Sequence, residues 1–452
     1  MKHFVTYTLL LGTIAFYSCG NKPNQSMADE KAPDSIVISD EALLDSVQRL
    51  TIDYFWMGAE PNSGLARERY HEDDYYPEND KNVITSGGSG FGIMALIAGI
   101  ERGFITRDEG LARFVHIMDF LESAERFHGA YPHWMYGETG KVKPFSAKDN
   151  GGDLVETAFL IQGLLALHQY YINGSSEEKA LAARIDKLWR EVEWDWYRNG
   201  RNVLYWHWSP DYGWEMNFPV RGFNECLIMY VLAASSPTHP IPSEAYHEGW
   251  AEGGDIVQPH TVEGYTLNLR NQGLACGPLF WAHYSFLGLN PNGLSDQYAN
   301  YFDEMRNYTL INRAYCVRNP KGYKGYGDEL WGLTASYSVK GYAGHAPDEQ
   351  RDQGVISPTA ALSSIVYTPE ESMQVMRHLW EMGNRVAGSF GFYDAFSETE
   401  NWYPRRYLAI DQGPIPVMIE NYRTQLLWNL FMSHPDIQQG LQKLGFKTSE
   451  SK

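Results

Sequence analysis

The sequence predicts an all-α fold, an (α/α)6 toroid of six inner and six outer helices, and two observations lead to this expectation. An apolar helix followed by a more polar, amphipathic helix recurs six times along the chain, and repeats of this kind bury their apolar helices by stacking on neighbours. The spacing between repeats is irregular, whereas an open solenoid has a fixed period. We therefore expect the pairs to close into a ring, with the open solenoid as the alternative.

The helical pairs follow one another from a leading helix expected over residues 39–56. The clearest pair is "SGFGIMALIAGIERGFI", apolar on nearly all faces, and "TRDEGLARFVHIMDFLESAER", in which Thr106 and Glu109 have the spacing of a capping box. The other inner segments are "DLVETAFLIQGLLALHQYY", "FNECLIMYVLAASSP", "GPLFWAHYSFLGL", "SPTAALSSIVY" and "PIPVMIENYRTQLLWNLFM". Their outer partners are "SSEEKALAARIDKLWREVEWDWY", "IPSEAYHEGWA", "SDQYANYFDEMRNY", "TPEESMQVMRHLWEMG" and "PDIQQGLQKLGF".

The connections between these helices are of two kinds. Links from an inner to an outer helix are short, but links from an outer to the next inner helix are long. In a ring of pairs all the long links emerge on one face, around the N-termini of the inner helices, and long ordered loops on a rigid scaffold commonly carry functional sites. We expect the site on that face. The long links cover roughly residues 57–84, 126–152, 199–221, 252–276, 308–356 and 386–411.

The N-terminal segment has the pattern of an export signal. A basic start and an apolar run over residues 4–17 precede "SCG", which is typical of a bacterial lipobox, and the run is too short to span a membrane as a mature helix. We expect cleavage before Cys19 and anchoring to the outer membrane through a lipid on its thiol; an ordinary signal peptide is the alternative. The expected organisation is a signal peptide over 1–18, a flexible tether over 19–38 and a single domain over 39–447.

Composition narrows the classes of ligand. The 452 residues include 56 acids and 37 bases, for a formal charge of −19, which disfavours nucleic acids and other polyanions as ligands. A neutral ligand and a monomeric protein are expected. Cys226, Cys276 and Cys316 are too dispersed for a disulfide framework, and the histidines do not have zinc-ligand spacing. No metal or cofactor is therefore expected.

The long links are rich in aromatic residues interleaved with carboxylates and amides, in stretches such as "YWHWSPDYGWEMNFP" and "NWYPRRYLAIDQGP". This mixture suits a sugar, because its apolar face stacks on rings while its hydroxyls take hydrogen bonds. Packing of the loops themselves is the alternative for any one ring. The expected substrate-binding residues are Trp134, Trp206, Trp208, Tyr212, Trp214, Arg221, Asn224, Tyr326, Trp331, Tyr393, Trp402 and Asp411.

Three carboxylates gather where one long link becomes a buried helix, in "PFSAKDNGGDLVETAFL". Asp153 and Glu156 are three residues apart and share a helix face, with Asp149 in the loop before them. A helix N-terminus tolerates such acids, and one of them, Asp153, is expected as an ordinary N-cap. Since one cap suffices, at least one of the three acids is expected to face the cleft.

Glu225 stands at the head of the next inner helix, in "RGFNECLIMY". A carboxyl at the start of a buried helix, facing a cleft lined with rings, is expected to have a raised pKa. A general acid needs that property. The alternative is a structural salt bridge between Glu225 and Arg221.

The chain also resembles a known family. "FHGAYPHWMYGETG", "DNGGDLVETAFLIQGLL", "VLYWHWSPDYGWEMN", "FNECLIMYVLAASSPTHPI", "INRAYCVRNPKGYKGYG" and "AIDQGPIPVMIENYRTQLLWNLFM" are similar to motifs of the bacterial glucoamylase-like proteins that include glycoside hydrolase family 144. The resemblance covers roughly residues 40 to 446. It implies an (α/α)6 barrel, an inverting mechanism without a metal, and a substrate of β-1,2-linked glucan or sophoro-oligosaccharides, cut internally or from a chain end. It also points to Asp149, Asp153, Glu156 and Glu225 as the acidic site residues.

Inversion requires a protonated acid at the glycosidic oxygen and a carboxylate that activates water across the ring. Our hypothesis makes Glu225 the general acid and Asp149 or Asp153 the base, with Glu156 orienting them or binding a hydroxyl. The other candidate functions are a glucoamylase-like hydrolase of another neutral glucan and a non-catalytic surface glycan-binding lipoprotein. A polysaccharide lyase is disfavoured, because an anionic uronate needs a basic cleft and the chain is strongly acidic.

Overall fold

The structure is a computed structural model that describes residues 38–77 and 80–448. The expected signal peptide over 1–18 and nearly all of the expected tether lie outside the described residues. From Asp40 onward the chain forms one compact, helix-rich unit. Among the helices of the described part, none is long and apolar enough to cross a membrane.

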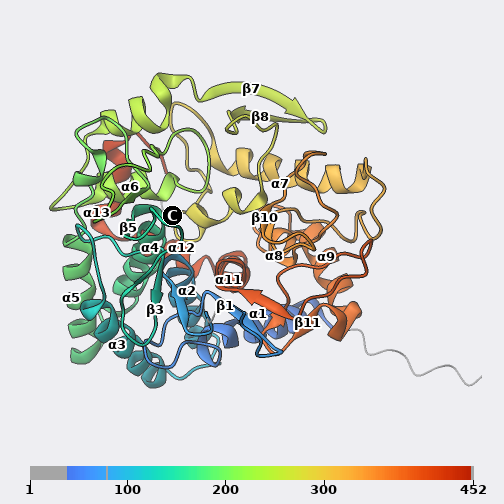
Figure 1. The fold of residues 1–452 in the computed structure, drawn as a ribbon, viewed down its shortest axis with the longest axis horizontal. Helices are drawn as coiled ribbons and strands as arrows, with labels where there is room; N and C mark the ends of the chain where they lie inside the picture. The colour runs from blue at the N-terminus through green and yellow to red at the C-terminus, as the bar shows by residue number, and fades with distance from the viewer. Residues whose placement is uncertain (1–37, 78–79, 449–452) are drawn as a thin grey trace, which may run out of the picture. The chain divides into compact units, whose positions relative to one another are not determined.

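Short links join α2 to α3 and α4 to α5, and the longer links between other α-helices carry short strands and single 3-10 or π-helical turns (Figure 1). The α-helices are α1 (Asp40–Trp56), α2 (Ser86–Glu101), α3 (Arg107–Ser123), α4 (Leu154–Tyr171), α5 (Ser176–Arg190), α6 (Leu227–Ser235), α7 (Tyr301–Arg318), α8 (Pro358–Leu362), α9 (Pro369–Met382), α10 (Ala409–Gln412), α11 (Pro414–Thr424), α12 (Leu426–Met432) and α13 (Pro435–Lys443).

The inner helices α2 and α4 are buried on nearly all sides and pack closely together. The close approach depends on two glycines. A Cβ on Gly90 would lie 2.1 Å from the carbonyl oxygen of Phe159, and a Cβ on Gly163 would lie 2.1 Å from the carbonyl oxygen of Gly90. Any side chain at these positions would push the two helices apart. This contact holds the N-termini of α2 and α4 side by side.

The outer helices are amphipathic and lie toward the periphery, as α3 and α5 do in Figure 1. The predicted capping box of α3 is confirmed. The backbone N–H of Glu109 donates to the Thr106 hydroxyl at 3.3 Å, and the Thr106 N–H donates back to the Glu109 carboxylate at 3.1 Å. A second capping box, formed by Ser175 and Glu178, starts α5.

Several predicted helices differ from the observed elements. Helix α8 ends at Leu362, before the expected end at residue 367, and α7 runs to Arg318, beyond the expected end at residue 308. Three other segments differ more. The segment predicted as an inner helix at "GPLFWAHYSFLGL" forms two short 3-10 turns instead, Leu279–Ala282 and Tyr284–Phe286. The backbone of this segment forms hydrogen bonds with the side chain of Gln162 on α4. The Gln162 amide donates to the Tyr284 carbonyl at 3.0 Å and accepts from the Gly288 N–H at 2.9 Å. The outer partner of α6 is a π-helical turn, Ala245–Trp250. The last inner helix breaks at Gln425, which has a φ of +61°, between α11 and α12.

Short antiparallel ladders tie the long links together and position their side chains. The pairs are β1 (Arg69–His71) with β13 (Arg406–Leu408), β7 (Val257–Val262) with β8 (Tyr265–Leu269), β9 (Ala335–Ser336) with β10 (Ala343–Gly344), and β11 (Ala387–Gly388) with β12 (Gly391–Phe392). Strands β2 (Val83–Thr85), β3 (Trp134–Tyr136) and β4 (Val142–Lys143) form a further sheet, and β5 (Gly152–Asp153) pairs with β6 (His207–Trp208).

Candidate active site

Asp153 is the hub of the acidic cluster at the start of α4. It is fully buried and caps the helix, because its Oδ1 accepts from the N–H groups of Val155 at 3.0 Å and Glu156 at 2.9 Å. Its Oδ2 accepts from the indole N–H of Trp206 at 3.0 Å and from Nδ1 of His133 at 2.9 Å. The expected N-cap is therefore confirmed, and both carboxylate oxygens of Asp153 are occupied by donors.

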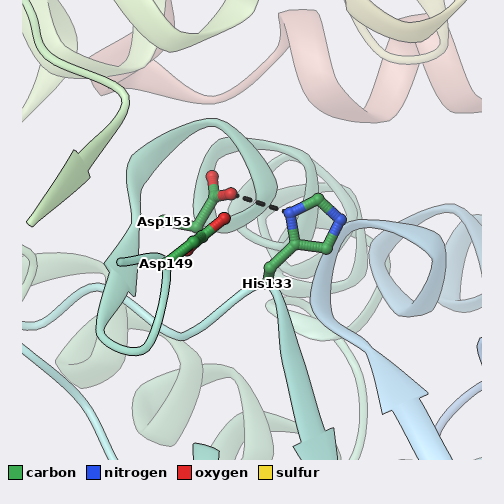
Figure 2. Close-up of side chains that lie close together, drawn as sticks. All are labelled: His133, Asp149 and Asp153. Carbon is green, nitrogen blue, oxygen red and sulfur yellow. Dashed lines mark hydrogen bonds and ion pairs between the residues drawn. The ribbon is translucent and has the colours of Figure 1, made fainter. Parts of the chain in front are cut away.

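Two histidines that sequence reasoning had set aside complete this cluster. Figure 2 shows His133 with the carboxylates of Asp149 and Asp153 side by side. His207 is paired with Asp153 across the β5–β6 ladder, and its Nε2 lies 3.2 Å from Asp149 Oδ2. A signal was present in the sequence, because the two histidines occupy matching "PHW" and "WHW" tripeptides in successive long links.

The charge of His133 is set by its acidic surroundings. Burial alone would lower the pKa of this imidazole, but the carboxylates of Glu156 and Asp153 outweigh burial and raise the pKa to about 9. His133 is therefore an imidazolium at neutral pH, and its Nε2 lies 3.9 Å from Glu156 Oε1. The ligand atoms of His133, Asp149 and Asp153 are close enough together to approach a cation. The hydrogen bonds already described account for their positions.

Glu156 lies one turn into α4 and meets the N-terminus of α2. Its Oε2 accepts from the Gly87 N–H at 2.9 Å and from the Thr85 hydroxyl at 3.4 Å. A Cβ on residue 87 would lie 2.4 Å from the same oxygen, so glycine is required for this contact. Burial raises the pKa of Glu156 to about 7 in spite of the neighbouring His133.

Glu225, at the head of α6, is buried and has no ion-pair partner among the described residues. Burial raises its pKa to about 7, with the negative charges of Glu156 and Asp153 adding to the effect. Arg221 does not form the salt bridge that was the alternative. It donates instead to the carbonyl oxygens of Glu248 at 3.4 Å and Gly249 at 3.2 Å.

Glu156 and Glu225 line the same cavity, which has a volume of about 470 Å³. A volume of this size is typical of a small-ligand site. The cavity combines aromatic walls with a few charged groups, as a sugar site requires. Its other lining residues are Glu68, Arg69, Thr85, His133, Trp134, Lys143, Phe145, Phe159, Trp206, Phe280, Tyr284, Tyr337, Tyr342, Leu408 and Ile410.

A second pair of buried carboxyls, Asp394 and Asp411, lies beside this cavity. Asp394 accepts from the Tyr337 N–H at 2.8 Å, and Tyr337 lines the cavity. Burial raises the pKa of Asp394 to about 6, and burial together with the neighbouring Asp394 raises the pKa of Asp411. Neither acid has a cation partner among the described residues, and these pKa shifts favour one proton shared between the two acids.

The predicted substrate-binding residues divide into three groups. Trp134 and Trp206 line the cavity, and Trp402 lines a second hollow described below. Trp208 and Trp214 pack against Trp196, with ring centroids 5.2 and 4.8 Å away. This contact agrees with the alternative in which the rings pack the loops themselves. The others lie outside the cavity lining: Tyr212 and Arg221 are exposed, Tyr326 is half-buried, and Asn224, Trp331, Tyr393 and Asp411 are buried.

Known proteins share this fold and sequence. Residues 217–435 match the family model named glycoamylase. The structure of an endo-β-1,2-glucanase from Chitinophaga pinensis is 64% identical, with a TM-score of 0.91, and the match covers 91% of this chain and 99% of that one. The structure of a Bacteroides caccae protein described as a glucoamylase candidate is 73% identical, with a TM-score of 0.90, over 91% of this chain and 100% of that one.

A curated relative from Parabacteroides distasonis is an exo β-1,2-glucooligosaccharide sophorohydrolase acting at the non-reducing end. It is 47% identical over 426 residues, which is 90% of this chain, and the chain spans 58% of the length of that relative. These similarities place the protein among the glycoside hydrolases. The chain belongs to the bacterial glucoamylase-like family that includes glycoside hydrolase family 144.

Proposed function

We propose that the protein hydrolyses β-1,2-linked glucan or sophoro-oligosaccharides with inversion at the anomeric carbon. The observation that carries this proposal is Glu225, a buried carboxyl with a pKa of about 7 in a cavity lined by aromatic rings. Similarity to the endo-β-1,2-glucanase and to the sophorohydrolase supports the glucan linkage. The formal charge of −19 agrees with a neutral substrate.

Glu225 is the general acid in this proposal. With a pKa of about 7 it carries a proton in roughly half of the molecules at pH 7, and this proton is donated to the glycosidic oxygen as the bond breaks. Its burial and the lack of a cation partner among the described residues are what hold the proton there. A salt bridge between Glu225 and Arg221 would instead have lowered the pKa of Glu225 and favoured its ionised form.

The base comes from one of two carboxyls. Glu156 lines the cavity and faces the His133 imidazolium, which favours its ionised form. Asp411 is the second candidate, because Ile410 before it and Tyr284 line the cavity; the pKa of Asp411 is raised by burial and by Asp394, so its proton must pass to Asp394 before Asp411 can act as the base. Asp153 has both oxygens occupied and is proposed to position His133 and Trp206, while Asp149 holds His207.

The scaffold of this site is proposed to be a closed (α/α)6 ring. Support comes from the order of contacts, in which α2 packs on α4, α4 on α6, and α11 on both α8 and α2. Hydrogen bonds also link the 3-10 segment that follows α6 in the ring to the residues just after α8. His283 meets the Ser364 hydroxyl at 2.9 Å, and Tyr367 donates to the Ala282 carbonyl at 2.9 Å. The last inner segment thus returns to the first.

The protein is further proposed to be monomeric and held at the outer membrane by a lipid on Cys19. The "SCG" tripeptide after an apolar run supports the anchor. Hydrolysis of another neutral glucan and glycan binding without catalysis are the competing functions. They differ from the proposal in the products formed from β-1,2-glucan.

The test compares Glu225→Gln with the parent on linear β-1,2-glucan and on starch. The parent should release sophoro-oligosaccharides of inverted anomeric configuration, detected by NMR at early times, and leave starch intact. Glu225→Gln should lower kcat by about 10³, the usual contribution of general acid–base catalysis. Glu215→Gln is the matched control, because Glu215 is exposed and its carboxylate is paired only with Lys148 among the described residues. A parent without activity on β-1,2-glucan, or a Glu225→Gln variant with near-normal turnover, would overturn the proposal.

A further inference from the structure

A second hollow adjoins the catalytic cavity. It has a volume of about 680 Å³ and is walled by the loop from Asn401 to Arg406, by Asp73 and by the turn from Tyr337 to Gly341. None of the acids assigned to the proposed chemistry lines it. Its lining combines rings with two arginines, which is the composition of a carbohydrate contact rather than of a reaction centre.

The two hollows are parts of one surface. Tyr337 lines both of them. The β9–β10 hairpin also contributes to both, with Tyr342 in the catalytic cavity and Val339 in the outer hollow. Tyr337 is therefore a common wall of the two hollows, which lie next to each other.

The β1–β13 ladder fixes the spacing between the two hollows. Leu408 on β13 lines the catalytic cavity, and Arg406 on the same strand lines the outer hollow. Residues two apart on a strand lie on the same face about 7 Å from each other. That separation is comparable with one sugar ring, so consecutive units of one glucan chain can occupy both hollows.

The outer hollow contains side chains whose polar groups form no hydrogen bond or ion pair within the described part of the protein. Among the described residues, Trp402 is in contact with no other aromatic ring, and Arg406 has no carboxylate or hydrogen-bond partner for its guanidinium. Arg406 lies over the Tyr337 ring, with its Cζ 5.8 Å from the centroid. An indole face and an unpaired guanidinium fork suit the apolar face and the hydroxyls of a glucosyl unit.

The wall of the hollow is held in place before any ligand arrives. Glu72 accepts from the hydroxyl of Tyr393 at 2.8 Å, from Nε of Arg405 at 2.8 Å and from the hydroxyl of Tyr407 at 3.1 Å. Trp402 and Ser397 exchange two backbone hydrogen bonds of 2.9 Å. Since the loop needs no ordering on binding, its contacts contribute to affinity without a large entropic cost.

We propose that the outer hollow is a distal subsite for the same β-1,2-glucan chain that the catalytic cavity cleaves, with Trp402 and Arg406 as its sugar-contacting residues. This inference rests on the proposed function. The subsite binds the part of a long chain beyond the units held in the catalytic cavity. It therefore favours polymer over short oligosaccharides through KM, while kcat stays unchanged.

The test measures kcat and KM of Trp402→Ala and Arg406→Gln on polymeric β-1,2-glucan and on the shortest sophoro-oligosaccharide that the parent cleaves. KM for the polymer should rise about tenfold, equivalent to ~1.4 kcal/mol of lost binding, with kcat within about twofold of the parent. The value of kcat/KM for the short substrate should not change. Trp380→Ala, which removes an exposed indole from α9, is the matched control and should leave both substrates unaffected.

Thermal melting of each variant checks its folding, and Trp402→Phe provides a milder change that keeps an aromatic ring at the position. This variant should retain most of the affinity for polymer. Equal losses on short and long substrates, or no change in KM for the polymer with a correctly folded Trp402→Ala, would overturn the distal subsite. A parent that fails to cleave β-1,2-glucan at all would instead overturn the proposed function, so the two failures are distinguishable.

Discussion

Two buried carboxyls on different inner helices, Asp153 and Glu225, differ in the direction of their pKa shifts. At the start of α4, Asp153 accepts four hydrogen bonds and is paired with the His133 imidazolium, so its pKa is lowered although burial opposes this. At the head of α6, Glu225 is buried without a cation partner among the described residues, and its pKa is raised. A buried carboxyl is thus ionised where hydrogen-bond donors and a cation surround it, as at Asp153, and tends to hold a proton where, as at Glu225, no cation is found among the described residues. In the proposed mechanism the partnered side, at the start of α4, holds the site in place, and the unpartnered side, with Glu225, supplies the proton.

The strongest test of this contrast is Asp153→Asn. The amide keeps the shape of the side chain but brings an NH2 group against the N–H donors of His133 or Trp206. We expect a loss of about 3 kcal/mol in the free energy of unfolding, because buried donors lose their acceptor and a buried cation loses its partner. Urea unfolding measures it, with the exposed Asp303→Asn as control. A loss below that of the control variant would show that the cluster contributes little.

His133→Gln tests the cation of the same cluster. The folded pKa of about 9 lies above the ordinary value of 6.5, so the stabilisation is present below pH 6.5 and is lost as the pH rises through 9. The shift corresponds to on the order of 3 kcal/mol for the parent across that window. The glutamine variant should lack this loss, so the stabilities of parent and variant should converge near pH 10. Parallel curves for parent and variant would contradict the assignment of charge to His133.

Asp411→Asn makes the matching change on the unpartnered side. Burial raises the pKa of Asp394 and Asp411 in the folded protein, so their contribution to stability is fully present below about pH 4 and declines as the pH rises. Asparagine removes one of the two acids, and we expect the variant to be more stable than the parent at pH 8 by about 1 kcal/mol. Urea midpoints at pH 5 and pH 8 measure this difference.

The same variant separates the two candidate bases. If kcat falls about 10³-fold for Asp411→Asn but not for Glu156→Gln, Asp411 is the base, and the reverse result assigns Glu156. A variant that loses stability equally at both pH values would show that Asp394 and Asp411 do not share a proton.

Gly87→Ala should have the smallest effect on stability. The new Cβ would lie 2.4 Å from Glu156 Oε2 and displace the carboxylate from its amide donor at the start of α2. We expect kcat/KM on β-1,2-glucan to fall about tenfold while the free energy of unfolding changes by less than about 1 kcal/mol, because alanine is the better helix former. Gly327→Ala is the control, since nothing lies within 4 Å of its added Cβ. An unchanged kcat/KM would show that Glu156 need not be held by this amide.

The parts of the molecule governed by local pattern were predictable from sequence. The capping box at Thr106, the cap at Asp153 and the burial of Glu225 follow from spacing and from the apolar runs behind them. The partners of these residues were not predictable. His133 and His207 meet through β5–β6 pairing between separate links, and no local pattern encodes the register of such short strands.

The same limit applies to the segment over 277–289. It reads as an apolar helix, but Gln162, more than a hundred positions earlier in the chain, binds its backbone and replaces helical hydrogen bonds. Tertiary contacts decided its conformation over its local preference. The pairing of Asp394 with Asp411 was likewise hidden, because each acid taken alone is compatible with an ordinary structural role.

The contact between α11 and α2 has a consequence for biosynthesis. Helix α2 is buried along almost its whole length, and part of its cover is supplied by residues synthesised more than three hundred positions later. A nascent chain that has not yet reached α11 therefore exposes part of an apolar helix to solvent, and one that ends before β13 also lacks Leu408 and Ile410, which line the cavity. Synthesis must therefore pass α11 before α2 is fully covered, and a chain terminated before that point would be prone to aggregate.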